Sequence, residues 1–372
     1  MTQKSIHIIG GGVAGLSLAW RLVQSGLRVT VFDKGAIGRG ASWAAAGMLA
    51  AVVEAEPGED VLLPFVLESQ RIWPEFAREL QSYTGLDIGY RESGTLFVAA
   101  ERDDEGLLKQ RFDFLKARSL PVKWLERSEL RKREPYFSPR VTHGFYSASD
   151  HQVDNRMLVD ALHAACKKAG VELHAHADVS EIKISGNRAT HLVVNDGIIA
   201  VDAVVLAAGA WSGTIKGMPL EALPPVFPMK GQLLALQMDA RQPLLRHVVW
   251  TPQLYLVPRS DGRLIIGATL EDKGFDASLT AGGILHLLRE TWEALPGMEE
   301  LPLLEAWAGF RPTSRDDAPI LGESAIENIG FMTGQHRHGI LMTPLLASAM
   351  SEYILKGRLP EIAAPFTMQR FK

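Results

Sequence analysis

The stretch "SIHIIGGGVAGLSLAWRLVQSGLRVTVFDK", residues 5–34, constrains the fold more than any other. A short apolar run precedes Gly10, Gly12 and Gly15, which have the spacing G-x-G-x-x-G, and apolar residues then recur at helical spacing up to Gly26. In such a unit the first glycine makes a tight turn, the second admits a pyrophosphate to the backbone, and the third lets helix and strand pack closely. The positive end of the helix faces the phosphates. The pattern predicts a Rossmann-like α/β domain that binds a dinucleotide; a glycine-rich turn in an unrelated α/β domain is the alternative.

Asp33 lies at the end of an expected second strand, residues 28–32. Its carboxylate can accept hydrogen bonds from ribose hydroxyls, and it disfavours a 2′-phosphate, which would require a cation there. No second fingerprint of this kind occurs in the sequence. If this site holds FAD, the electrons therefore come from the substrate itself and not from a nicotinamide, which favours an oxidase or dehydrogenase over a reductase.

Composition excludes several other classes of protein. The chain is 47% hydrophobic and 22% charged, which is typical of a soluble globular protein. Its net charge of −4 gives no basic footprint for nucleic acid. No apolar run reaches the roughly 18 residues of a spanning helix, so we expect no membrane association and a cytoplasmic location. The single cysteine, Cys166, lies in a helical pattern and is expected in the core.

Two further stretches are expected near the dinucleotide. Residues 44–47 are small, and small residues let a backbone pass close to a flat ligand; a buried alanine-rich helix is the alternative. The apolar run 203–206 predicts a buried strand beside the first strand, which would bring Gly209 to the cofactor.

A basic cluster, His336, Arg337 and His338, lies between two glycines and two apolar runs. A buried arginine needs an anion, which would be charge on the flavin or substrate, or an acid such as Asp316 or Asp317. The two histidines do not favour a metal site, because no matching acids or cysteines accompany them. Thr343 is an expected N-cap of a last helix that ends near Gly357.

Several motifs together resemble one family. The stretches "HIIGGGVAGLSLAWRL", "ASWAAAGML", "VVLAAGAWS", "YLVPRSDGRLIIGAT", "WAGFRPTSRDDAPILG" and "GQHRHGIL" are similar to those of the D-amino-acid-oxidase-like flavoproteins, in the same order over nearly the whole chain. Within that family the chain is most similar to the members that oxidise glycine and supply an imine for the thiazole ring of thiamine. The resemblance implies two discontinuous domains, an FAD-binding domain and an antiparallel-sheet (α+β) substrate domain. The FAD-binding domain would comprise residues 1–83, 149–222 and 305–372, and the substrate domain residues 84–148 and 223–304.

The resemblance also implies an activity. FAD would accept a hydride from Cα of glycine or another small amino acid at its N5 atom, giving an imine, and oxygen would reoxidise it to form hydrogen peroxide. The cysteine that some relatives attach to the flavin has no counterpart in Cys166, which implies non-covalent FAD. A D-amino-acid dehydrogenase that passes electrons to a quinone or partner protein and a non-catalytic flavoprotein that binds a partner are the alternatives. The family often forms homo-oligomers, and the residues do not bear on that point.

Particular residues carry the implied roles. By resemblance Arg311 holds the substrate carboxylate, the Tyr255 hydroxyl joins it, Arg337 lies at the substrate end of the flavin, and Met48 lines the site. The positions expected to contact the cofactor are Gly10, Gly12, Val13, Ala14, Gly15, Asp33, Lys34, Ala41, Ser42, Ala46, Gly47, Met48, Val179, Gly209, Gln335, His336, Arg337, His338, Gly339, Ile340 and Leu341. The chain departs from the family pattern at Asp33, Gln253, Leu270 and His338, where glutamate, histidine, methionine and asparagine are expected.

The residue types fit this chemistry. A planar guanidinium can clamp a carboxylate in two parallel hydrogen bonds and so fix the position of Cα, although an interdomain ion pair is the alternative for Arg311. Tyr255 alternates with leucines and is equally compatible with a core position. The sequence shows no obvious general base. Because the amine must be neutral to release a hydride, the rate should rise toward alkaline pH.

Overall fold

The computed structural model describes residues 5–100 and 104–372. Its first unit is a six-stranded sheet in the order β18-β19-β12-β1-β2-β8. The pairs are parallel except for β18 against β19. The strands are β1 (Ser5–Ile9), β2 (Arg28–Phe32), β8 (Glu172–His174), β12 (Ala203–Leu206), β18 (Ile320–Glu323) and β19 (Ile329–Thr333).

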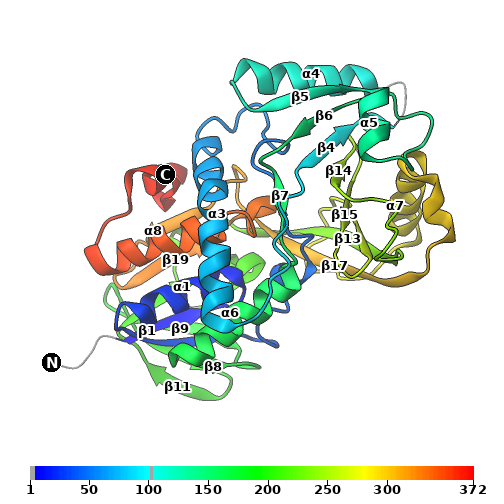
Figure 1. The fold of residues 1–372 in the computed structure, drawn as a ribbon. Helices are drawn as coiled ribbons and strands as arrows, with labels where there is room; N and C mark the ends of the chain where they lie inside the picture. The colour runs from blue at the N-terminus through cyan, green and yellow to red at the C-terminus, as the bar shows by residue number, and fades with distance from the viewer. Residues whose placement is uncertain (1–4, 101–103) are drawn as a thin grey trace.

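The two faces of this sheet are covered differently. Ile6 and Ile8 pack into one core with the helices on one face, whereas Ile9 packs into another core with a three-stranded sheet. The helices are α1 (Val13–Gln24), α3 (Leu63–Thr84), α6 (Asn155–Ala169) and α8 (Thr343–Lys356), and the small sheet contains β9 (Val179–Ser185), β10 (Arg188–Val194) and β11 (Gly197–Ala200). Figure 1 shows these helices gathered together over the sheet. The predicted Rossmann-like α/β unit is confirmed.

The second unit is an eight-stranded sheet in the order β17-β13-β16-β15-β14-β4-β6-β5, antiparallel except for β14 against β4. Its strands are β4 (Thr95–Val98), β5 (Val122–Glu126), β6 (His143–Ser147), β13 (Phe227–Gln237), β14 (Val248–Trp250), β15 (Tyr255–Pro258), β16 (Arg263–Gly267) and β17 (Leu303–Thr313). Its helices are α4 (Asp104–Ala117), α5 (Arg127–Arg133) and α7 (Ala281–Ala294). Figure 1 shows α4 and α7 on the outside of this unit.

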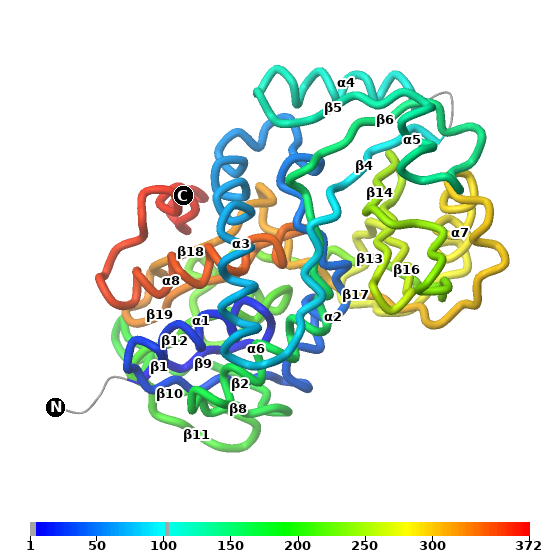
Figure 2. The backbone as a smooth tube through the Cα atoms, viewed as in Figure 1, coloured from blue at the N-terminus to red at the C-terminus, as the bar shows by residue number. Residues whose placement is uncertain are grey.

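The chain passes between the two units several times. In Figure 2 the first unit contains blue, green and orange segments, while the second contains cyan, yellow-green and gold ones. A short helix, α2 (Ala41–Ala44), and a two-stranded sheet of β3 (Met48–Leu49) and β7 (His151–Gln152) lie on these connections. The run of small residues is therefore not a continuous helix, because it turns after Ala44.

One expected domain boundary is wrong. Residue 305 lies inside β17, which pairs with β13 along the eight-stranded sheet up to Thr313. Residues 305–313 therefore belong to the larger sheet. The rest of the domain division stays a prediction, and residues 1–4 and 101–103, within its first two segments, lie outside the described residues.

The glycine turn between β1 and α1 has the close backbone contacts that the sequence predicted. Gly10 has φ +112°, and an added Cβ would lie 2.2 Å from the Ala207 carbonyl oxygen. A Cβ on Gly15 would lie 1.9 Å from the Gly10 carbonyl oxygen. Only glycine allows α1 to approach β1 and β12 this closely.

The start of the last helix differs from the expectation. Thr343 is not the N-cap of α8: Met342 is, and the Thr343 hydroxyl donates to the Gly339 carbonyl. Cys166 is buried as expected, and burial raises the pKa of its thiol to about 12.

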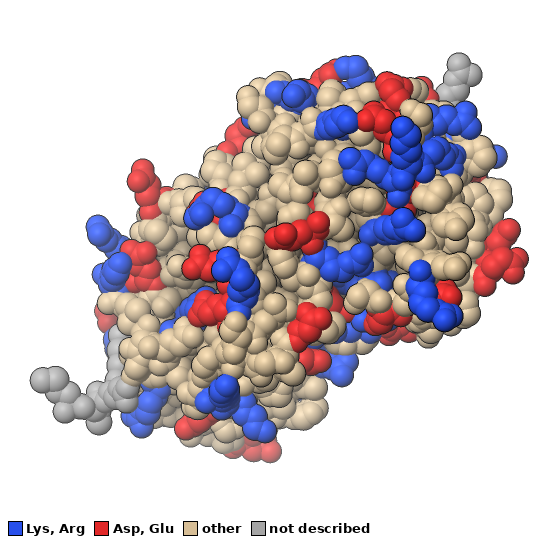
Figure 3. Space-filling model, in the orientation of Figure 1, with Lys and Arg blue, Asp and Glu red and all other residues tan. Residues whose placement is uncertain are grey.

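Within the described ranges no helix has the length and apolar character to cross a membrane. Acidic and basic side chains are interspersed on the face of the molecule that Figure 3 shows.

Candidate active site

A cavity of about 890 Å³ lies where the carboxyl ends of β1, β2 and β12 meet the eight-stranded sheet. Ligands of open α/β sheets bind at this edge. Every residue expected to contact the cofactor lines the cavity except Gly15, His338 and Leu341. Gly15 lies beneath the turn, and the Leu341 carbonyl accepts hydrogen bonds from Ser69 and Trp73 of α3.

The glycine turn is braced by polar side chains. The Asp33 carboxylate accepts hydrogen bonds from the backbone N–H groups of Gly11 and Gly35, both at 2.9 Å. The Ser42 hydroxyl accepts from the Val13 N–H at 3.0 Å, at the start of α1. The Lys34 ammonium lies 3.4 Å from the centre of the Trp211 ring. Since a carboxylate has about four acceptor positions, Asp33 can hold the turn and still accept from a ribose.

The cavity has features that fit a bound dinucleotide. An added Cβ on Gly209, at φ +56°, would meet no atom within 4 Å, so this turn leaves open space toward the cavity. The side-chain amide nitrogen of Gln335 is buried and has no hydrogen-bond partner among the described residues. A buried polar atom of this kind requires a ligand or water. The residues that line the cavity therefore fit a bound FAD.

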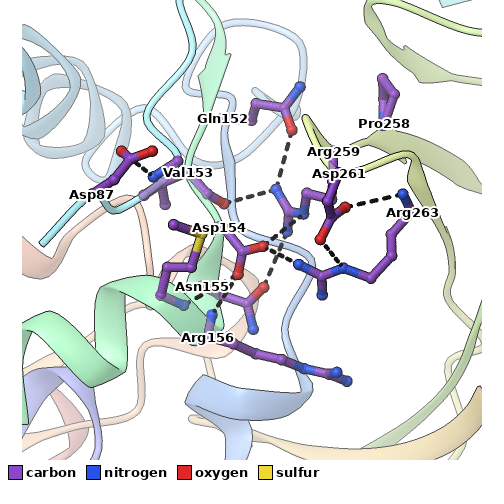
Figure 4. A network of polar contacts seen from close by, with 12 residues as sticks. Asp87, Gln152, Val153, Asp154, Asn155, Arg156, Pro258, Arg259, Asp261 and Arg263 are labelled. Atoms are coloured by element: carbon purple, nitrogen blue, oxygen red, sulfur yellow. Dashed lines mark hydrogen bonds and ion pairs between the residues drawn. The ribbon is translucent and has the colours of Figure 1, made fainter. Parts of the chain in front are cut away.

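A buried arginine that the sequence analysis did not identify positions the loop of small residues. The Arg259 guanidinium, 6% exposed, donates to the Ala46 carbonyl at 2.7 Å, the Val153 carbonyl at 2.8 Å and the Asn155 side chain at 3.1 Å. Asn155 in turn donates to the carbonyls of residues 42 and 43. Figure 4 shows Arg259 between Gln152, Val153, Asp154 and Asn155. The larger sheet thus fixes the backbone that lines the cavity.

Tyr255 on β15 and Arg311 on β17 both line the cavity from the larger sheet, in which β13 and β16 lie between these two strands. The Arg311 guanidinium donates to the carbonyls of Lys230, at 3.5 Å, and Thr269, at 3.3 Å, and also interacts with the Tyr255 hydroxyl. No carboxylate of the described ranges pairs with it, so the interdomain ion pair is not found. Burial raises the pKa of the Tyr255 hydroxyl, and the adjacent Arg311 opposes that rise. Arg311 and Tyr255 together form one corner of the cavity, the Arg311 corner, where a cation without an acidic partner in the described chain lies beside a buried phenol.

Arg337 has acidic partners other than those expected. Its guanidinium lies 2.6 Å from the Glu59 carboxylate and 3.5 Å from that of Glu54. Of the acids named from the sequence, Asp316 pairs with Arg370 and Asp317 lies near His336. A role for Arg337 in holding the substrate therefore competes with the ion pairs that Glu54, Glu56 and Glu59 supply.

The histidines of the basic cluster remain neutral. Burial, assisted by Arg337, lowers the pKa of His336 to about 3 and lowers that of His338 well below its usual value. The His336 Nδ1 atom lies 2.9 Å from the Thr313 hydroxyl. No group of three or more potential metal ligands occurs in the part of the chain that the structure describes.

The sequence analysis did not identify two buried acids, Asp150 and Glu54. Asp150 accepts hydrogen bonds from the backbone N–H groups of Val52 and Val53 and from Gln70, and burial raises its pKa to about 6. Glu54, which follows this segment, is 5% exposed and lines the cavity. The signal was a glutamate within the apolar run "MLAAVVEAE", where a charge has no evident partner.

Of the departures from the family pattern, Asp33, Gln253 and Leu270 lie on the cavity wall, whereas His338 does not. Gln253 and Leu270 both line it, and Leu270 is 66% exposed. Met48 lines it from β3. Gln253 and Leu270 are in no core cluster of the described chain, so they can change the shape of the cavity without altering the core, whereas Met48 packs against the core of the larger sheet.

Comparisons with known proteins agree with this geometry. The family model described as DAO, FAD dependent oxidoreductase, matches residues 5–353. Glycine oxidase of Geobacillus kaustophilus is 34% identical over 100% of this chain and 98% of its own length. Its crystal structure superposes with a TM-score of 0.91 at 32% identity, covering 99% of each chain. Bifunctional protein ThiO/ThiG of Trichormus variabilis is 35% identical over 99% of this chain, which spans 55% of that protein. The chain belongs to the DAO family of FAD-dependent oxidoreductases.

Proposed function

We propose that this protein is an FAD-dependent oxidase of glycine or another small amino acid. The observation that carries the proposal is Arg311, a guanidinium without a carboxylate partner in the described chain, beside Tyr255 in the cavity that fits the cofactor. Such a corner is complementary to the carboxylate of an amino acid. Relatives named glycine oxidase favour glycine.

The residues of the chain would act mainly by positioning. Arg311 binds the substrate carboxylate through two parallel hydrogen bonds, and the Tyr255 hydroxyl donates a third. This fixes Cα, which is the largest requirement for a transfer between two bound molecules. FAD, when bound, supplies the acceptor for the hydride of Cα and passes the two electrons to oxygen, which gives hydrogen peroxide. Neutral His336 and Gln335 line the cofactor end of the site without adding positive charge.

The product would be an imine, which water converts to glyoxylate or another keto acid and ammonia. A relative named ThiO/ThiG supports a role in supplying the imine for the thiazole ring of thiamine. The FAD is non-covalent in this proposal, because the one cysteine, Cys166, is buried beneath α1 and donates to the Leu16 carbonyl.

An anaerobic reduction experiment tests the proposal. The purified protein is mixed separately with glycine, sarcosine and a panel of D- and L-amino acids, and the flavin absorbance is followed. Bleaching by glycine, with peroxide formed on admitting air, is the expected result. Bleaching without reoxidation by oxygen would identify a dehydrogenase, and absence of bleaching by every amine would leave only a non-catalytic flavoprotein.

A further inference from the structure

Glu54 combines burial with an open acceptor. Its side chain is 5% exposed and lines the cavity that Arg311 and Tyr255 also line. Neither of its carboxylate oxygens accepts a hydrogen bond from any described residue, and Arg337 donates to the Glu54 backbone carbonyl at 3.2 Å. Buried carboxylates are normally satisfied by donors. This one is left available to a donor in the cavity.

The charged groups around Glu54 do not satisfy it. The Arg337 Nε atom lies 3.5 Å away and has no hydrogen-bond partner, and Glu59 takes the closest contact of that guanidinium at 2.6 Å. His338 lies 3.8 Å away and is kept neutral by burial. The titratable groups that act on Glu54 are Arg337, His338, Asp150, Arg111, Glu56 and Tyr255.

A second cavity adjoins the first at this residue. It has a volume of about 460 Å³ and is lined mainly by aromatic and apolar side chains of α4 and of residues 55–57 and 250–252. Glu54 borders both cavities. A group in that position can take a proton from one space and release it into the other.

We infer that the Glu54 carboxylate receives the ammonium group of the substrate and removes its extra proton before the hydride leaves Cα. The inference rests on the proposed function, since Arg311 and Tyr255 would hold the other end of the same molecule. In this step an N–H bond of the ammonium breaks and an O–H bond forms on Glu54. The nitrogen keeps its electron pair, which then forms the second bond of the C=N group as the hydride leaves with its own pair.

The acidity of Glu54 suits this task. Burial raises its pKa to about 8, although the adjacent Arg337 opposes the rise. A proton acceptor is most effective when its pKa lies near the working pH. Below pH 8 Glu54 is increasingly protonated and cannot accept, and above pH 8 it is ionised. In the wild-type holoenzyme kcat/KM should therefore rise to a plateau with an apparent pKa near 8.

The test compares Glu54→Gln with the wild type, using glycine as substrate and glycolate as a probe. Glycolate has the carboxylate but no amine, so it reports the Arg311 corner alone through the change it causes in the flavin spectrum. Glu54→Gln should keep the glycolate Kd within about threefold, lower kcat/KM for glycine at least about 100-fold, and move the rise of the pH profile to more alkaline values.

A matched control separates proton transfer from an effect on Arg337. Glu59→Gln removes the closest partner of Arg337, yet it should leave the rise of kcat/KM near pH 8. A similar displacement of the pH profile in both variants would show that Glu54 acts only by balancing Arg337, and an unchanged profile in Glu54→Gln would overturn the inference outright. If Glu54→Gln fails to fold, Glu54→Asp retains an ionisable acid at shorter reach. A displaced rise of kcat/KM with pH in Glu54→Asp would support the inference. A pH profile equal to that of the wild type would refute it.

The proposed function can fail separately. If no amine reduces the wild-type flavin, the oxidase proposal falls and Glu54 has no substrate to act on. If glycine reduces the wild type and the Glu54→Gln profile does not move, only the assignment of Glu54 is wrong.

Discussion

Arg311 and Arg337 line one cavity but have different surroundings. Arg311 contacts two backbone carbonyls and no acid in the described chain, whereas Arg337 has Glu59 at 2.6 Å and Glu54 at 3.5 Å. A cation without a partner is available to an anionic ligand, while one between buried acids chiefly offsets their charge. Removal of the Arg311 side chain should therefore affect substrate binding, whereas removal of the Arg337 side chain should affect stability.

Arg311→Ala should abolish substrate recognition and spare the cofactor. Loss of the charge-assisted clamp is expected to raise KM for glycine at least about 100-fold, or ~3 kcal/mol. The ratio of flavin absorbance to protein absorbance should stay at the wild-type value. A colourless variant would place Arg311 in the cofactor site instead.

Arg337→Ala should reduce stability. With Glu54 and Glu59 left without their cation, the free energy of unfolding is expected to fall by about 3 kcal/mol. Urea unfolding at fixed FAD concentration measures this. Arg71→Ala is the control, because that arginine forms an exposed pair with Glu68 and its loss should change stability by less than about 0.5 kcal/mol. Equal effects of the two substitutions would contradict the role given to Arg337.

At the scale of elements, the contact between α1 and β1 is the most tightly specified part of the fold. It depends on glycine at positions 10 and 15, where an added Cβ would meet backbone oxygen at 2.2 and 1.9 Å. Backbone atoms cannot move aside as a flexible side chain can. The start of α1 and the turn before it are therefore fixed as one piece.

Gly15→Ala should displace α1 and weaken FAD binding. Overpacking of this kind costs about 1–3 kcal/mol, which corresponds to a rise in the FAD Kd of roughly 10- to 100-fold. Fluorescence titration of the apoprotein with FAD measures the change. Gly282→Ala in α7 is the matched control, because no atom lies within 4 Å of its added Cβ and the helix tolerates alanine. Unaltered affinity in Gly15→Ala would mean that the turn adapts.

The sequence predicted elements whose signals are local. Residues 5–34 and the strand Ala203–Leu206 were recognised because turn, periodicity and glycine spacing all lie within a few residues of one another. The boundary at 305 was misplaced because β17 gains its length by pairing with β13, far away in the chain. Glu54 was missed for a similar reason. Its burial depends on Asp150 and Arg337, which contact its segment only in the folded molecule.

At the scale of the whole molecule, buried acids make stability depend on pH. Burial raises the pKa of Glu54 from 4.5 to about 8 and that of Asp150 from 3.8 to about 6. Between each pair of values the folded chain binds more protons than the unfolded chain, so these groups favour folding below about pH 4. Their contribution falls as pH rises through 6 and 8.

In Glu54→Gln the free energy of unfolding should therefore fall less than in the wild type as the pH rises toward 8. The difference in urea midpoint between variant and wild type is expected to grow in favour of the variant from pH 5 to about pH 8 and then level off. Urea unfolding at a series of pH values and fixed FAD concentration gives this difference directly. A constant offset would mean that Glu54 does not change its charge in this range.

The order of strands in the six-stranded sheet also bears on how the protein is made. β1 is synthesised early, but β12 and β19 come some 200 and 320 residues later, and the cavity wall is not complete until residues 335–340 have joined it. Contacts between segments so distant form slowly, and a nascent chain folds in the order of its synthesis. On the ribosome the glycine turn therefore stays exposed until β12 and β19 have been synthesised. Cofactor capture is thus a late event of biosynthesis, and a chain released before β19 should remain colourless.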